Sequence, residues 1–114
     1  MNKMVKITNM WKTIKVCKKN KRNVKELSYN EINLNEYIVI DVRSRREFSE
    51  KHLKTAINIP LLELKSKIEL YIRRKDKKIL VYCEYGARSL KAVKILNNLG
   101  YTNVFNLKGG LEKI

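Results

Sequence analysis

Short apolar segments alternate with helical patterns from residue 24 onward. Residues 37–40 and 79–82 are apolar at consecutive positions, which is typical of parallel strands covered on both faces. Between such segments, apolar residues recur every three or four positions, as on the buried face of a helix. The pattern predicts a three-layer α/β domain with a five-stranded parallel sheet, whose strands are residues 24–27, 37–40, 56–59, 79–82 and 104–107.

Capping residues mark the ends of the predicted helices. The sequences SYNE and SRRE match capping boxes, so a first helical turn is expected after Ser28 and a short helix after Ser44. Pro60 suits the first turn of a longer helix. Ser89 is expected to cap the last helix, and Gly100 to end it.

The composition fits one globular domain. The chain has 114 residues, of which 44% are hydrophobic. Its longest apolar run, residues 79–83, is far shorter than the ~20 residues that span a bilayer, and no secretory signal is evident. Two cysteines do not make a disulfide framework, so we expect a cytoplasmic protein with reduced thiols. No metal site is predicted, because no Cys/His cluster has ligand spacing, and no cofactor is expected.

Charge divides the chain into an N-terminal extension, residues 1–23, and a domain, residues 24–114. The net charge is +15, yet residues 1–25 hold nine cations and no acid, whereas residues 26–114 hold 17 cations and 11 acids. We expect the extension to be a solvated basic arm; contact with nucleic acid or an anionic membrane surface is the alternative. Its apolar residues follow a weak helical spacing, at Met4, Ile7, Trp11 and Ile14.

The segment CEYGARS, residues 83–89, carries the chemistry. Cys83 follows the most apolar strand, and a helix begins a few residues later. Ligands of parallel α/β sheets bind at the carboxyl ends of strands, and the free amides of a helix start attract anions. Gly86 permits the loop to turn its amides toward one centre. The segment therefore predicts an activated thiolate nucleophile at Cys83.

Five segments in order and spacing resemble the rhodanese-like family of single-domain sulfurtransferases. The resemblance covers nearly all of residues 24–114 and implies a sheet order of 3-2-4-5-1. Lys51 and Thr55 stand where the family commonly has glycines in surface turns, and we expect modest stability costs there. The matching segments are DVR (41–43) with EF (47–48); HL (52–53) with AINIP (56–60); YC (82–83) with Gly86 and RS (88–89); LGY (99–101); and NV (103–104) with LKGG (107–110).

The resemblance implies that Cys83 carries sulfane sulfur as a persulfide. Arg88 would orient the donor, while Asp41 and Arg43 would support the neighbouring loops. The backbone amides of the substrate-binding loop would hold the anionic sulfur; these residues are Glu84, Tyr85, Gly86, Ala87 and Arg88.

The expected donor is thiosulfate or another small sulfur-donor anion, and the acceptor cyanide or a thiol. A monomer is expected. One alternative is a persulfide relay module for a protein partner or for tRNA thiolation. The other is a phosphatase or arsenate reductase of the same fold, in which the loop has one more residue between cysteine and arginine. Because four residues separate Cys83 from Arg88, sulfur transfer is favoured.

Other polar residues are interpreted individually. Arg43 and Glu47 have the spacing of a local ion pair. His52, the only histidine, is expected to be structural. Cys17 is expected to be an incidental thiol rather than a resolving one. Glu84 is expected on the rim of the pocket, where its negative charge disfavours thiosulfate.

Overall fold

The computed structural model describes residues 24–114 of the protein. The predicted extension, residues 1–23, its helical pattern and Cys17 therefore lie outside the described residues. Within the described range, no helix is long and apolar enough to cross a membrane.

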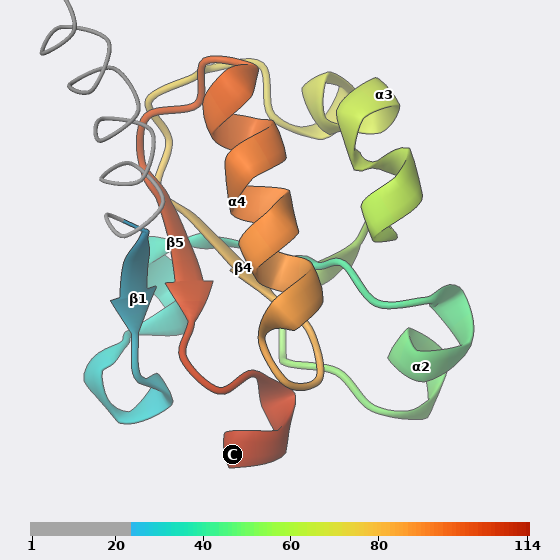
Figure 1. Ribbon diagram of the computed structural model, residues 1–114. Helices are drawn as coiled ribbons and strands as arrows, with labels where there is room; N and C mark the ends of the chain where they lie inside the picture. Colours follow the sequence, from blue (N-terminus) through green and yellow to red (C-terminus); the bar gives the residue numbers. More distant parts are fainter. Residues whose placement is uncertain (1–23) are drawn as a thin grey trace, which may run out of the picture.

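Five parallel strands form one sheet in the order β1-β5-β4-β2-β3, the order that the resemblance implied (Figure 1). Strand β4 lies at the centre and is buried along its whole length. The edge strand β3 is shorter than predicted, because it pairs only with β2, through two residue positions. The strands are β1 (Lys25–Leu27), β2 (Ile38–Asp41), β3 (Ile57–Asn58), β4 (Ile79–Tyr82) and β5 (Val104–Leu107).

Helices α3 (Leu61–Tyr71) and α4 (Ala87–Asn98) cover one face of the sheet (Figure 1). Leu64 and Ile68 of α3, with Val93 and Leu96 of α4, belong to the larger core cluster on this face. The opposite face has a smaller core cluster, which includes Leu80 and Leu107 of the sheet. It is covered by loops and 3₁₀ turns, so the second helical layer is thin; the turns are η1 (Tyr29–Glu31), η2 (Leu34–Glu36) and η3 (Leu111–Lys113).

The carboxyl ends of the strands meet at one edge of the sheet, where the loop between β4 and α4 lies (Figure 1). Helix α2 (Arg45–Glu50) and turn η3 lie at the same edge. The segment CEYGARS thus begins at the end of the most buried strand, as the sequence predicted.

Helix α4 begins at Ala87, so the expectation that Ser89 caps it was wrong. Gly86, with φ 110°, is the N-cap, and its carbonyl accepts the amide of Leu90 at 3.1 Å. A left-handed residue so close to the strand turns the chain directly into the helix. Ser89 is consequently inside the first turn, where its amide has no partner within the helix.

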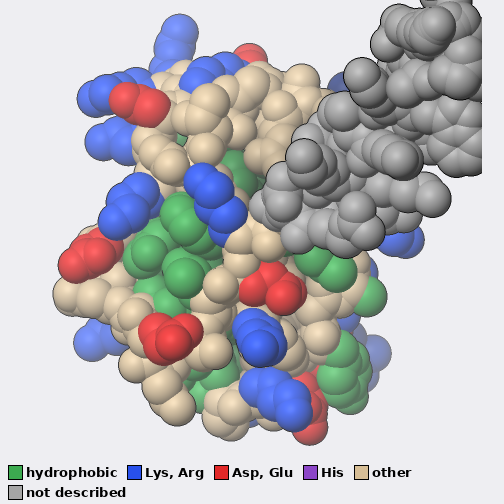
Figure 2. Space-filling model, turned by 60° about the vertical axis from the view of Figure 1, so that its left-hand side comes forward, with side chains coloured by type: hydrophobic (Ala, Val, Ile, Leu, Met, Phe, Trp, Pro, Cys, Tyr) green, Lys and Arg blue, Asp and Glu red, His purple; other side chains and the backbone are tan. Residues whose placement is uncertain are grey.

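Figure 2 shows a face of the domain with mixed charge. Lysine and arginine side chains stand there among acidic ones, with apolar side chains between them. Among the described residues drawn on this face, basic side chains are therefore interrupted by acidic and apolar ones.

Candidate functional site

The thiol of Cys83 lies inside a cradle of backbone amides. Its side chain is 1% exposed. The amide of Gly86 donates to Sγ at 3.0 Å, and the amide of Ser89 at 3.3 Å. The hydroxyl of Ser89 lies 3.4 Å from Sγ and donates to the carbonyl of Gly86 at 3.0 Å. Two backbone amides of the loop and of the start of α4 therefore converge on this sulfur atom.

Turn η3 is hydrogen-bonded to the backbone of the loop between β4 and α4. The amide of Leu111 donates to the carbonyl of Cys83 at 2.8 Å, and the amide of Glu112 to the carbonyl of Glu84 at 2.9 Å. In a trans peptide the N–H points opposite to the C=O, so these bonds direct the amides of Glu84 and Tyr85 away from η3. The tail of the domain therefore contributes to the shape of the cradle.

Gly110 makes this close approach feasible. Its φ is +70°, and a Cβ built on it would lie 2.5 Å from the carbonyl oxygen of Glu84 and 2.7 Å from that of Cys83. Both obstructing atoms belong to the backbone, which cannot move without moving the cradle. A side chain at position 110 and the observed loop are therefore incompatible.

The side chains of the loop point outward in different directions. Tyr85 is 72% exposed. Glu84 is partly exposed and contacts Arg43, with 3.2 Å between Oε1 and Nη1. The prediction that Glu84 stands on the pocket rim did not foresee this partner, which places the carboxylate beside a guanidinium.

Arg43 is buried in a network that begins at the end of β2. Its side chain is 3% exposed, and Asp41 accepts hydrogen bonds from its backbone amide, Nε and Nη2 at 2.8–3.1 Å. Nη2 also donates to the carbonyl of Lys51. The pKa of Arg43 is raised although burial opposes this, because the hydrogen bonds and charge of Asp41 outweigh the burial. Arg43 thus contacts both the segment after α2, through Lys51, and the loop after β4, through Glu84.

The predicted ion pair between Arg43 and Glu47 was wrong. Glu47 instead binds Arg88 of the loop, with Nη1–Oε1 at 2.8 Å and Nη2–Oε2 at 3.0 Å. The hydrogen bonds from Arg88 lower the pKa of Glu47 to about 2, so this carboxylate is ionised at neutral pH. The guanidinium of Arg88 therefore has a carboxylate partner in Glu47, and its role in orienting a donor stays a prediction.

His52 has contacts within the α2 turn. Its Nδ1 lies 2.7 Å from the carbonyl oxygen of Phe48, and its ring stacks on that of Phe48 with centroids 3.8 Å apart. These contacts fit the structural role that the sequence predicted.

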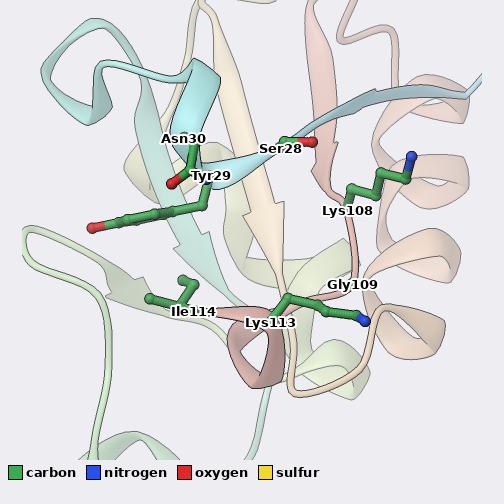
Figure 3. Close-up of a pocket in the computed structure, with 7 residues that line it drawn as sticks. All are labelled: Ser28, Tyr29, Asn30, Lys108, Gly109, Lys113 and Ile114. Carbon is green, nitrogen blue, oxygen red and sulfur yellow. The ribbon is translucent and has the colours of Figure 1, made fainter.

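A groove of about 460 Å³ lies between residues 28–30 and the C-terminal residues of the domain (Figure 3). Lys113 runs across Gly109 in the direction of the candidate loop, and a Cβ on Gly109 would meet its side chain. The lining residues are Ser28, Tyr29, Asn30, Lys108, Gly109, Lys113 and Ile114.

The sequence reasoning missed two parts of this site. Glu47 was assigned to a capping box, which it does form with Ser44, but its contact with Arg88 joins elements far apart in the chain. The support that Gly110 and Leu111 give the loop was also missed. Its only signal was the double glycine, because glycine with a positive φ often marks a close backbone approach.

Known proteins support the same fold and family. The family model for the rhodanese-like domain matches residues 23–114. The chain is 43% identical over 75 residues to the thiosulfate sulfurtransferase PspE of Escherichia coli, covering 66% of this chain and 71% of that protein. It is 40% identical over 87 residues to the adenylyltransferase and sulfurtransferase UBA4 of Candida albicans, covering 71% of this chain but only 20% of UBA4.

The fold agrees with a solved structure as well. A rhodanese-related protein of Thermoplasma volcanium superposes with a TM-score of 0.70 at 33% identity, over 78% of this chain and 88% of that one. The strand order, the cysteine loop after β4 and these matches agree, and the protein belongs to the rhodanese-like domain family.

Proposed function

We propose that the protein is a sulfurtransferase that carries sulfane sulfur as a persulfide on Cys83. The observation that supports this most directly is the convergence of the Gly86 and Ser89 amides on Sγ. Amides fixed in this way stabilise a negatively charged sulfur without having to reorganise during the reaction.

The proposed reaction has two half-reactions. The Cys83 thiolate attacks the sulfane sulfur of a donor, a new S–S bond forms, and the donor's own bond to that sulfur breaks with its electron pair. A thiolate or cyanide acceptor then attacks the outer sulfur of the Cys83 persulfide and releases the Cys83 thiolate. The amides of residues 84–88 hold the terminal sulfur between the two steps.

Two features favour sulfur over phosphate chemistry. Only four residues separate Cys83 from Arg88, whereas the phosphatases of this fold have one more. Arg88 already makes a two-point contact with Glu47. Its guanidinium is therefore less free to make a bidentate contact with a phosphate dianion.

A persulfide relay is the second candidate function. The similarity to UBA4, a protein named for adenylyltransferase and sulfurtransferase activities, supports it. In a relay the acceptor is a protein or part of a tRNA-thiolation system rather than a free small molecule. The chemistry at Cys83 is the same in both cases.

Intact mass spectrometry tests the proposal. The full chain is incubated with a sulfur donor, desalted and weighed, and one added sulfur atom per chain is expected. Cys83→Ser is expected to gain none and to keep its cooperative unfolding, whereas Cys17→Ser is expected to gain one. Sulfur retained by Cys83→Ser and lost by Cys17→Ser would move the chemistry to Cys17 and overturn the assignment.

A further inference from the structure

The groove between η1 and η3 has a cationic side and an apolar side (Figure 3). In this view the side chains of Lys108 and Lys113 extend to the right, and those of Tyr29 and Ile114 lie to the left. Both lysines are exposed, and neither forms an ion pair with a carboxylate of residues 24–114. No aspartate or glutamate is among the described residues that line the groove.

The apolar side is accessible to a partner. Tyr29 is 39% exposed and Ile114 is 48% exposed, so a large part of each side chain faces solvent. The groove therefore combines positive charge that lacks a carboxylate partner in the described part of the chain with apolar surface that a partner can bury.

Gly109 joins this groove to the cradle of Cys83. It lines the groove, and its backbone nitrogen lies 4.0 Å from the position of a Cβ built on Gly86. The turn that follows it is hydrogen-bonded to the loop, through the amide of Leu111 and the carbonyl of Cys83. A molecule bound in the groove therefore contacts the same short segment that supports the cysteine loop.

We propose that this groove docks an acidic segment of a partner protein, in which carboxylates alternate with apolar side chains. The carboxylates contact Lys108 and Lys113, and an apolar side chain covers Tyr29 and Ile114. Complementary charge directs the segment to the groove, and the burial of apolar surface adds affinity. A volume of about 460 Å³ is in the range of pockets that hold a ligand of modest size, so the occupant is a short segment.

A nucleic acid suits this groove less well. The affinity of a protein for nucleic acid depends on cations that neutralise several phosphates, and the groove has two lysines. Stacking of successive bases needs several aromatic side chains, and the lining has one, Tyr29. The balance of two cations with an apolar side therefore favours a peptide.

NMR of the full chain, labelled with ¹⁵N, locates the bound peptide. The probe is a synthetic peptide in which three glutamates alternate with two phenylalanines, and the control probe has glutamine in place of glutamate. We expect the glutamate peptide to shift the amide signals of Tyr29, Lys108, Gly109 and Lys113, and the signal of Gly86 in the adjoining loop. The glutamine peptide is expected to bind at least about fivefold more weakly.

Fluorescence anisotropy measures the contribution of the two lysines. Lys108→Gln/Lys113→Gln is expected to raise the Kd of the glutamate peptide about five- to tenfold, because two ion pairs are lost. Lys91→Gln/Lys94→Gln is the matched control, since both lysines are exposed on α4 and form no ion pair within the described residues. It makes the same change in net charge and is expected to keep Kd within about twofold.

Two further variants separate the apolar contact and the sulfur chemistry. Tyr29→Ala is expected to raise Kd at least about threefold at both low and high salt, because the contact that it removes is apolar. Cys83→Ser is expected to bind the peptide as the wild type does. The docking proposal can therefore fail or hold independently of the sulfurtransferase proposal.

The outcomes decide both the site and the class of partner. Shifts at the groove, together with a loss of affinity in Lys108→Gln/Lys113→Gln but not in Lys91→Gln/Lys94→Gln, support the proposal. Equal losses in the two double variants, or shifts confined to residues 1–23, overturn it, because the peptide then binds through net charge alone. Absence of binding overturns it as well. A single-stranded RNA oligonucleotide that shifts the same amides at a lower concentration overturns the choice of a peptide partner.

Discussion

The amide of Leu111 donates a hydrogen bond of 2.8 Å to the carbonyl of Cys83, joining the last turn of the domain to its candidate nucleophile. The neighbouring bond from Glu112 to the carbonyl of Glu84 is 2.9 Å long. Together they fix two consecutive peptide planes of the loop, so the orientation of its amides depends on η3.

Gly110→Ala is expected to damage this arrangement. The added Cβ meets the carbonyl oxygens of Glu84 and Cys83 at 2.5 and 2.7 Å, and φ at this position is +70°. We expect a stability loss of about 2–4 kcal/mol from the strain and the overlap. The rate of sulfur loading on the folded fraction is expected to fall at least tenfold. Urea denaturation and single-turnover loading measure the two effects.

Gly100→Ala is the control for the positive φ alone. Its φ is +99°, but no heavy atom of the described residues lies within 4 Å of the added Cβ. It is expected to cost about 1–2 kcal/mol and to leave sulfur loading unchanged. Wild-type loading by folded Gly110→Ala would show that η3 does not shape the cradle.

Asp41→Asn is expected to destabilise the protein severely. Asp41 is buried and binds Arg43 through its backbone amide, Nε and Nη2. Removing one partner of a buried ion pair costs about 3–5 kcal/mol, a large part of the stability of a small domain. The free energy of unfolding in urea provides the measurement.

Glu84→Gln removes the other carboxylate partner of the Arg43 guanidinium, the one that is partly exposed. Its contact with Nη1 of Arg43 is longer, at 3.2 Å, and solvent reaches its side chain. We therefore expect a loss of less than about 1 kcal/mol. Equal losses in the Asp41 and Glu84 variants would contradict the view that burial decides the importance of each partner.

Thr55 stands where the family commonly has glycine, and replacing it with glycine is expected to make the folded protein more stable. Thr55 has φ 67°, in the left-handed region that disfavours a β-branched side chain by about 1–2 kcal/mol. Thr55→Gly relieves this strain but makes the unfolded chain more flexible, so we expect a net gain of about 0.5–1 kcal/mol. An increase in Tm by calorimetry would confirm it.

Lys51→Gly is the matched control at the other such position. Lys51 has φ −169°, which is extended backbone that any residue adopts. With no strain to relieve, the added flexibility is expected to cost about 0.5 kcal/mol. A stabilising effect at Lys51 as large as that at Thr55 would show that left-handed strain is not the cause.

The sequence predicted features that depend on periodicity and on local signals. Strand β4 was predicted with its observed ends, because its consecutive apolar residues allow a parallel strand covered on both faces. The start of the last helix was predicted wrongly, because Ser89 was taken as its cap and Gly86 only as a corner of the loop. Gly86 prevailed, since its left-handed conformation reverses the chain immediately after Cys83.

Ion pairs were predicted less well, because spacing identifies only neighbours in the chain. Arg43 and Glu47 are four positions apart, yet each is bound by a residue that folding brings from elsewhere. Glu84 reaches Arg43, and Arg88 reaches Glu47, once β2 and β4 lie side by side. Such partners depend on register and on loop direction, which no local pattern specifies.

The pair between Glu47 and Arg88 predicts a particular dependence of stability on pH. The hydrogen bonds from Arg88 lower the pKa of Glu47 from an ordinary 4.5 to about 2. Because the pKa is lower in the folded state, the carboxylate contributes stability above pH 4.5 and loses this contribution as the pH falls toward 2. Glu47→Gln is therefore expected to have a lower Tm than the wild type at pH 7, and the difference is expected to shrink between pH 5 and pH 2.

Glu50→Gln is the control, because the pair of Glu50 with Arg46 is exposed and 3.7 Å long. It is expected to change Tm little at any pH, since such pairs contribute little to stability. Other acid-sensitive groups, such as Glu63 with Arg45, are present in all three proteins and cancel in the comparison. A Tm difference for Glu47→Gln that stays constant from pH 7 to pH 2 would mean that Gln disturbs α2 by its shape, and that the charge of Glu47 adds nothing to the hold on Arg88.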